Sequence, residues 1–169
     1  MNTATPEQML AAINAAAAGN DDKELAVQPL RDAEVEDLRE TAKQAVAARN
    51  YPAAAEALNQ ALLIVPDDPA VLQERAEVAL LQSEFDRAET LAQRAFDLGS
   101  KVGPLCRRHS ETVRQVRERR LDIASAPARG KANAEDVARQ ASNAAHLAMK
   151  VAEASSQLQA CTVPGLNRM

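Results

Sequence analysis

At 169 residues the chain has the length of one domain, or of one domain with tails. Hydrophobic residues make up 46% of it, but alanine supplies much of that share and aromatic residues only 2%, which favours closely packed helices. Strand-forming residues are too few and too scattered to predict a sheet, so the sequence predicts an all-α protein. The net charge of −4 argues against a general nucleic-acid-binding protein.

The charges are distributed unevenly along the chain. Residues 1–100 carry 8 Lys/Arg against 18 Asp/Glu, residues 101–131 carry 9 against 3, and residues 132–169 carry 3 of each. The basic segment can therefore bind an acidic partner, or the acidic body of its own chain.

The first predicted helix begins at Thr5-Pro6-Glu7-Gln8, where Thr5 and Gln8 have the spacing of a capping box. It ends at Gly19-Asn20, and the polar residues up to position 33 predict a linker. The N-terminus lacks a charged segment followed by a hydrophobic stretch, and no apolar run has the length of a membrane span. We expect no integral membrane span, and a location in the bacterial cytoplasm or, if an export signal has been removed, in the periplasm.

Residues 34–67 and 69–101 repeat one pattern at an offset of 34 residues. Each segment predicts a helical hairpin, with small residues where the helices cross and an aromatic residue at the turn. The positions in register are Leu38 and Leu72, Ala42 and Ala76, Ala45 and Ala79, Tyr51 and Phe85, Ala54 and Ala88, and Ala61 and Ala95.

Residues 104–122 predict a further helix, which begins like a third repeat but carries Ser110 and Val113 where the repeats have alanine. A polar helix of this kind commonly closes the end of a helical array. Residues 134–160 predict a long helix with a continuous seam of small residues, which needs another surface to pack against. The predicted organisation is an N-terminal helix and linker, a repeat region with its closing helix, and a C-terminal linker and helix, at residues 1–33, 34–122 and 123–169.

The repeated pattern resembles the tetratricopeptide repeat (TPR), a family of scaffolds that bind other proteins. The resemblance implies a short α-solenoid of two hairpins plus a terminal helix, with extra helices at both ends and a concave groove formed by the first helix of each hairpin. Family members that grip the C-terminal carboxylate of heat-shock chaperones use lysine and asparagine side chains, and that clamp is not reproduced here. A bidentate arginine contact to an acidic peptide stays open, as does the interpretation of these residues as ordinary surface charges. The register places on or near the groove Arg39, Lys43, Gln73, Glu77, Arg107, Glu111 and Arg114.

The cluster Cys106-Arg107-Arg108-His109 is the one sequence feature that suggests reactivity, since neighbouring cations lower the pKa of a thiol. Burial of Cys106 as a small hydrophobic residue is the favoured interpretation. A Cys106–Cys161 disulfide, which would tie the C-terminal helix to the repeats, is a separate hypothesis. The two histidines have no zinc-site spacing and the five glycines form no phosphate loop, so the sequence predicts no metal, no cofactor and no enzymatic activity.

These features predict a protein–protein interaction module that binds a peptide or helix in the groove, with residues 134–160 filling part of it. One alternative is a structural homodimer assembled through the C-terminal helix. Another is an envelope assembly factor, with a redox-responsive version that uses the two cysteines, because small bacterial proteins of similar composition often serve as periplasmic lipoproteins. A protein or peptide is the expected partner, and no nucleic acid is expected.

Overall fold

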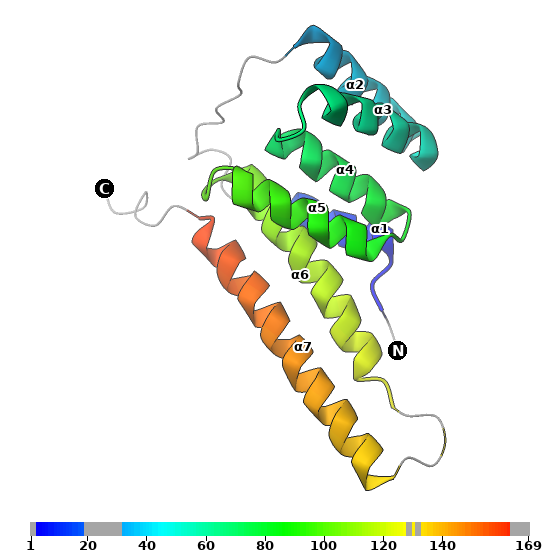
Figure 1. The fold of residues 1–169 in the computed structure, drawn as a ribbon, viewed down its shortest axis with the longest axis vertical. Coiled ribbons are helices and arrows are strands. Elements are labelled where there is room, and N and C mark those ends of the chain that lie inside the picture. The colour runs from blue at the N-terminus through cyan, green and yellow to red at the C-terminus, as the bar shows by residue number, and fades with distance from the viewer. Residues whose placement is uncertain (1–2, 19–31, 128–129, 131–132, 163–169) are drawn as a thin grey trace, which may run out of the picture.

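The computed structural model describes residues 3–18, 32–127, 130 and 133–162, and within these residues every regular element is an α-helix (Figure 1). The predicted all-α class is thereby confirmed. The expected linker between 19 and 33 lies almost entirely outside the described residues. The helices are α1 (Pro6–Ala18), α2 (Ala33–Ala47), α3 (Tyr51–Ile64), α4 (Pro69–Leu81), α5 (Phe85–Leu98), α6 (Pro104–Ala124) and α7 (Ala134–Ala160).

Local side-chain bonds explain where several helices begin. Before α1, the Thr5 backbone N–H donates to Gln8 Oε1 at 2.9 Å and the Gln8 N–H donates to Thr5 Oγ1 at 3.1 Å, which confirms the predicted capping box. Asp68 accepts a hydrogen bond from the Ala70 N–H at 2.9 Å, so that α4 begins at once after the previous hairpin. Pro69 opens α4, where its missing N–H leaves no hydrogen bond unmade.

The turns inside the first two hairpins have the same geometry. Arg49 and Ser83 both adopt a left-handed backbone, with φ of 58° and 60°. The N–H of Arg49 donates to the Val46 carbonyl at 2.9 Å, and that of Ser83 donates to the Leu80 carbonyl at 2.9 Å. Each pair of equivalent positions lies 34 residues apart, so the backbone repeats with the same period as the sequence.

Helices that follow one another in the chain pack as neighbours from α2 to α7. The prediction that α6 closes the array is wrong, because α7 lies antiparallel along α6 and makes a third hairpin with it (Figure 1). The buried side chain of Ala154 on α7 packs with Ala76, Ala92 and Val113, which belong to α4, α5 and α6. Ala154 is the one fully buried residue of α7, and residues 134–139 at its start are exposed.

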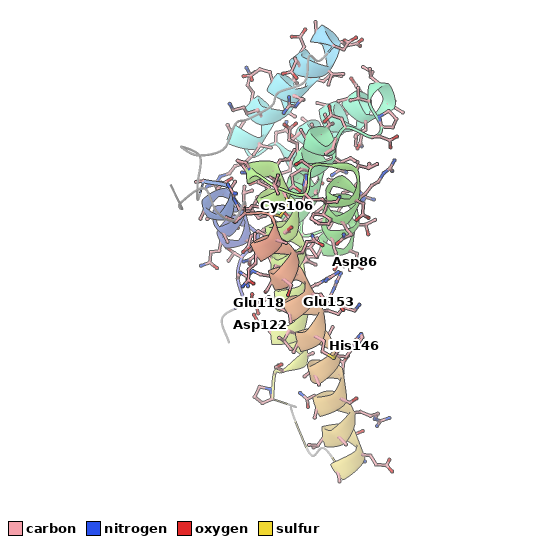
Figure 2. The ribbon with its side chains drawn as sticks, turned by 90° about the vertical axis from the view of Figure 1, so that its left-hand side faces the viewer. Asp86, Cys106, Glu118, Asp122, His146 and Glu153 are labelled. Atoms are coloured by element: carbon pink, nitrogen blue, oxygen red, sulfur yellow. A yellow bond between two sulfur atoms is a disulfide. The ribbon has the colours of Figure 1, made fainter. Side chains whose placement is uncertain are left out.

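The first helices of the three hairpins, α2, α4 and α6, form what we call the inner face. Helix α1 packs on α4 and α6, and Figure 2 shows it, in blue, on the side of the molecule opposite to α3 and α5. Its Met9 and Ile13 are fully buried against Ala79, Leu80 and Val116. The expectation that residues 134–160 fill part of the groove is corrected accordingly, since α1 covers part of the inner face and α7 packs along α6 as the second helix of its hairpin.

The Cys106–Cys161 disulfide is present and joins the first turn of α6 to the end of α7 (Figure 2). Both residues are buried, with exposed fractions of 1% and 0%. Ser110, which replaces the alanine of the repeats, lies beside them and accepts a hydrogen bond from Gln157 Nε2 at 3.1 Å. Among the described residues, none of the helices combines the length and hydropathy that a membrane crossing requires.

Candidate functional site

The part of the inner face that α1 leaves uncovered is a groove between α1, α2 and α4, with a cavity volume of about 460 Å³. That volume lies within the range of about 300–1,000 Å³ that is usual for ligand-binding pockets. We call it the open groove. Its lining residues are Leu10, Glu36, Arg39, Glu40, Ala42, Lys43, Val46, Leu58, Glu74, Glu77, Val78 and Leu81.

The floor of the open groove is aliphatic. Ala42 on α2 and Val78 on α4 are buried, and their short side chains let Leu58 of α3 reach the floor between the two helices. Val46 on α2 and Leu10 on α1 add partly buried aliphatic surface at the sides. This floor arises because α2 and α4 carry the small repeat residues on the sides where they approach each other.

The rims of the open groove are acidic, and one ion pair crosses it. Arg39 Nε on α2 donates to both carboxylate oxygens of Glu74 on α4, at 2.9 and 3.0 Å, and Arg39 Nη1 donates to Glu36 at 2.8 Å. The hydrogen bonds that Arg39 donates to Glu74 raise the pKa of Arg39 above its ordinary value, although partial burial works in the opposite direction. Arg39 is thus held by two carboxylates of its own chain, which leaves it poorly placed to bind an acidic peptide.

Three other rim residues differ in whether they form ion pairs. Glu77 accepts hydrogen bonds from Gln73 Nε2 at 2.9 Å and from Arg108 Nε of α6 at 3.0 Å. Lys43 is exposed and forms no ion pair with any of the described residues, and the same holds for Glu40 one turn before it. The uncompensated charges of the open groove therefore lie on α2.

The seven residues expected on the groove fall into three groups. Arg39, Lys43 and Glu77 line the open groove. Gln73, Arg107 and Glu111 are buried, with exposed fractions of 1%, 4% and 4%, because helix packing on α4 and α6 covers them. Arg114 lies apart from the open groove in a small hollow beside Ala4, where it pairs with Glu111 at 2.8 Å and Glu118 at 2.5 Å.

Arg107 holds α1 in place. Its Nε donates to the carbonyl oxygen of Ala16 at 2.9 Å, and its Nη2 donates to that of Ala17 at 3.2 Å. These carbonyls belong to the last turn of α1, which carries the negative end of the helix dipole, so a guanidinium there is favourable. The residue expected to contact a partner instead contacts a helix of the same chain.

A buried polar network connects α4 and α6 beneath the inner face. Gln73 Nε2 donates to Thr112 Oγ1 at 2.9 Å, and Gln73 Oε1 accepts from His109 Nδ1 at 2.8 Å. Burial, reinforced by the positive charges of Lys101 and Arg108, lowers the pKa of His109 to about 3. His109 is therefore neutral near pH 7, and it stabilises the contact of α4 with α6 as a hydrogen-bond donor.

The basic segment pairs with the acidic body of the same chain, which was one of the two partners left open for it. Glu89 on α5 accepts from Arg117 Nε at 2.8 Å and from Arg120 Nη1 at 2.6 Å, both on α6. Burial raises the pKa of Glu89, but these two arginines outweigh it, so the pKa lies below its usual value. A second cavity of about 600 Å³ lies beside these pairs, between α5, α6 and α7.

The structure shows how the residues considered for reactivity are engaged. Cys106 is held in the disulfide, so it is not a free thiol nucleophile. No group of three or more His, Cys, Asp or Glu residues suited to a metal ion occurs among the described residues.

Sequence reasoning missed several residues of the site. Leu10 was not expected because nothing in the α1 sequence specifies that this helix lies on the inner face. Glu74 and Arg108 were missed because their partners, Arg39 and Glu77, lie on other helices, at separations of 35 and 31 residues. The offset of 34 residues could have predicted these pairs. It places successive first helices side by side and so brings residues about 34 apart into contact.

The sequence matches no protein-family model, and a search among curated proteins finds no match.

Proposed function

We propose that this chain is a non-enzymatic interaction module of the tetratricopeptide-repeat type, and that the open groove binds a peptide or helix of a partner protein. The observation that carries the proposal is the groove itself, which combines an aliphatic floor with charged rims on a face that already holds one helix. Binding sites for peptides and helices typically combine apolar floors with a few polar groups in this way.

The repeated turns support the assignment to a TPR-type solenoid. Arg49 and Ser83 share both their backbone conformation and their hydrogen bonds at the offset of 34 residues, as described above. Tyr51 and Phe85 begin the second helices of the two hairpins at the same offset. A period of this length, repeated in backbone as well as in sequence, is typical of stacked helical hairpins.

Helix α1 supports the idea that the partner binds as a helix. It buries Met9 and Ile13, which are four residues apart on one side of the helix, against α4 and α6. This is the usual way in which an amphipathic helix lies in an apolar groove. The open groove continues the same face towards α2, with α1 as one wall.

The proposal is for binding rather than catalysis because of how the rim residues are engaged. Arg39, Glu74 and Glu77 are held in ion pairs between helices. Ion pairs of this kind fix the positions of the helices relative to one another.

A peptide-display selection tests the proposal. Peptides selected from a random library on the oxidised full chain are measured by fluorescence anisotropy against the chain and against two groove variants, Val46→Asp and Val46→Lys, which place either sign of charge on the aliphatic surface of the groove. We expect both variants to weaken binding, and the matched variant Leu63→Asp to leave it unchanged, since Leu63 is 86% exposed on α3 outside the groove. Selected peptides that bind all of these chains equally well would contradict the proposal, provided that circular dichroism finds each variant folded.

Self-association through α7 is the second candidate function, and exposed apolar side chains favour it. Met149 and Val137 on α7 are 66% and 54% exposed, and Ile123 at the end of α6 is 56% exposed. Light scattering on the wild-type chain and on Met149→Asp tests it. A dimer that becomes monomeric in the variant favours a structural homodimer, whereas a wild-type monomer rules this function out.

The disulfide supports an oxidising location, which for a bacterial protein is the periplasm or the exterior. Buried disulfides persist in oxidising compartments and are rare in the reducing cytoplasm. The envelope assembly factor is one form that the proposed module takes in such a compartment.

A further inference from the structure

We propose that the ligand of the open groove is a cationic amphipathic helix, with aliphatic side chains on one face and lysine or arginine beside them. This inference rests on the proposed function, because it assigns the chemistry of the partner at the same site.

The open groove carries an excess of negative charge. Its lining contains four glutamates against one arginine and one lysine. Arg39 does not offset the acidic rims towards a ligand, because Glu36 and Glu74 already hold its guanidinium. Glu40 and Lys43 both lack an ion-pair partner among the described residues, so the unpaired charges on α2 balance each other. The preference for a cation comes from the net charge of the lining, which is −2 because four glutamates face one arginine and one lysine.

The part of the chain that forms the groove is also negatively charged as a whole. The first 100 residues, which supply every residue of the lining, carry 8 Lys/Arg against 18 Asp/Glu. The excess of basic residues lies further along the chain. Of these residues, Arg108 pairs with Glu77 at the groove, whereas Arg117 and Arg120 pair with Glu89 on α5. A concave surface with a net excess of one sign of charge attracts ligands of the opposite sign and speeds their association.

The floor of the groove restricts which part of a ligand can enter it. Ala42, Leu58 and Val78 offer no buried hydrogen-bonding group, so the part of the ligand that enters must be aliphatic. Helix α1 already packs in this way on the adjoining surface, where Met9 and Ile13, from consecutive turns, are buried against α4 and α6. A second helix beside α1 would place residues four apart over the floor and its flanking residues over the rims on α2 and α4.

A pair of synthetic helical peptides tests the inference. Both peptides have about 16 residues, enough for measurable helicity, and carry Ile and Leu four apart on one face. One has lysines at the flanking positions and the other has glutamates there. Binding to the oxidised full chain is measured by fluorescence anisotropy at 50 and 300 mM salt.

We expect the lysine peptide to bind more tightly than the glutamate peptide, and we expect this preference to shrink at high salt because salt screens exposed ion pairs. Glu40→Lys should weaken binding of the lysine peptide by about fivefold, the size expected for an exposed ion pair that is lost and reversed. Glu56→Lys makes the same charge change on exposed α3, outside the groove, and should leave binding within about twofold of wild type.

Two results would overturn the inference. If the glutamate peptide binds as well as or better than the lysine peptide and Val46→Asp abolishes that binding, the groove binds helices of the opposite chemistry, and the proposed function stands. If neither peptide binds, the inference is wrong, and the display selection described above decides the proposed function independently.

Discussion

Single side chains on the inner face compensate one another's charge across helix boundaries. Arg39 pairs with Glu74 and Arg108 pairs with Glu77, so each hairpin is connected to the next by a partly buried ion pair. Removing one member of such a pair leaves the other without its partner, which costs more than the pair itself contributes. These residues are therefore better understood as connections between hairpins than as contacts for a ligand.

His109 gives a prediction about pH at the residue scale. Its pKa is about 3 in the folded chain and near 6.5 in an unfolded chain, because burial and the charges of Lys101 and Arg108 disfavour the imidazolium. The unfolded state binds the proton first as pH falls. The stabilisation is thus fully present above pH 6.5 and decreases between pH 6.5 and 3, by up to about 1.4 kcal/mol per pH unit.

Urea unfolding of the oxidised wild-type chain and of His109→Gln at pH 7 and pH 4.5 measures this effect. We expect the wild type to lose about 2–3 kcal/mol more than the variant, because glutamine hydrogen-bonds without titrating. Comparison with the variant removes the contribution of the carboxylates, which titrate in both chains. Equal losses in the two chains would show that His109 does not control this part of the pH dependence.

At the scale of helices, the sequence predicted most elements well and their contacts only in part. The long helix at residues 134–160 and the two hairpins follow from capping residues, prolines and the repeat itself. Where α1 and α7 pack does not follow, because each presents a stripe of small or aliphatic residues that fits several surfaces equally well. The position of α1 is fixed by contacts of Arg107 and Met9 with residues far away in the sequence. No local sequence pattern encodes those contacts.

Met9→Ala tests whether α1 is an integral cover of the inner face. Met9 is fully buried with Ala79, Leu80 and Val116, so truncating its side chain leaves a cavity and should lower the free energy of unfolding by about 2–5 kcal/mol. Hydrogen exchange should become faster at the amides of α1. Asn14→Ala changes an exposed position of the same helix and should have an effect within about 0.5 kcal/mol. Unchanged exchange in α1 of Met9→Ala would contradict the packing described here.

The disulfide gives a second prediction at the scale of helices. It closes a loop with a sequence separation of 55 residues and fixes the end of α7 to the start of α6. Replacing both cysteines by serine should lower the free energy of unfolding by about 2–5 kcal/mol, mainly through greater freedom of the unfolded chain. The check is chemical denaturation together with alkylation of the denatured, unreduced wild type. Incorporation of two labels before reduction would mean that the disulfide does not form.

At the scale of the whole molecule, charge organises the structure. The basic helix α6 lies against the acidic hairpins, where Arg117 and Arg120 neutralise Glu89, while the open groove keeps its acidic rims. The uneven charge could be predicted from the sequence, but the carboxylates with which the basic segment pairs could not. Composition does not specify which carboxylates an arginine contacts. The same limit applied to the groove. Its first-helix residues could be proposed from the repeat, but the covering by α1 that buries Arg107 could not.

In the function proposed above, the uncovered part of the inner face binds the partner. The most direct measurement is a titration of the isotope-labelled, oxidised full chain with the lysine-flanked peptide, followed by backbone amide chemical shifts. We predict that the largest shifts lie on α2 and α4, around Lys43, Val46 and Val78, with smaller shifts on α1 near Leu10. Shifts concentrated on α5 and α7, or shifts of equal size in Val46→Asp, would contradict the claim.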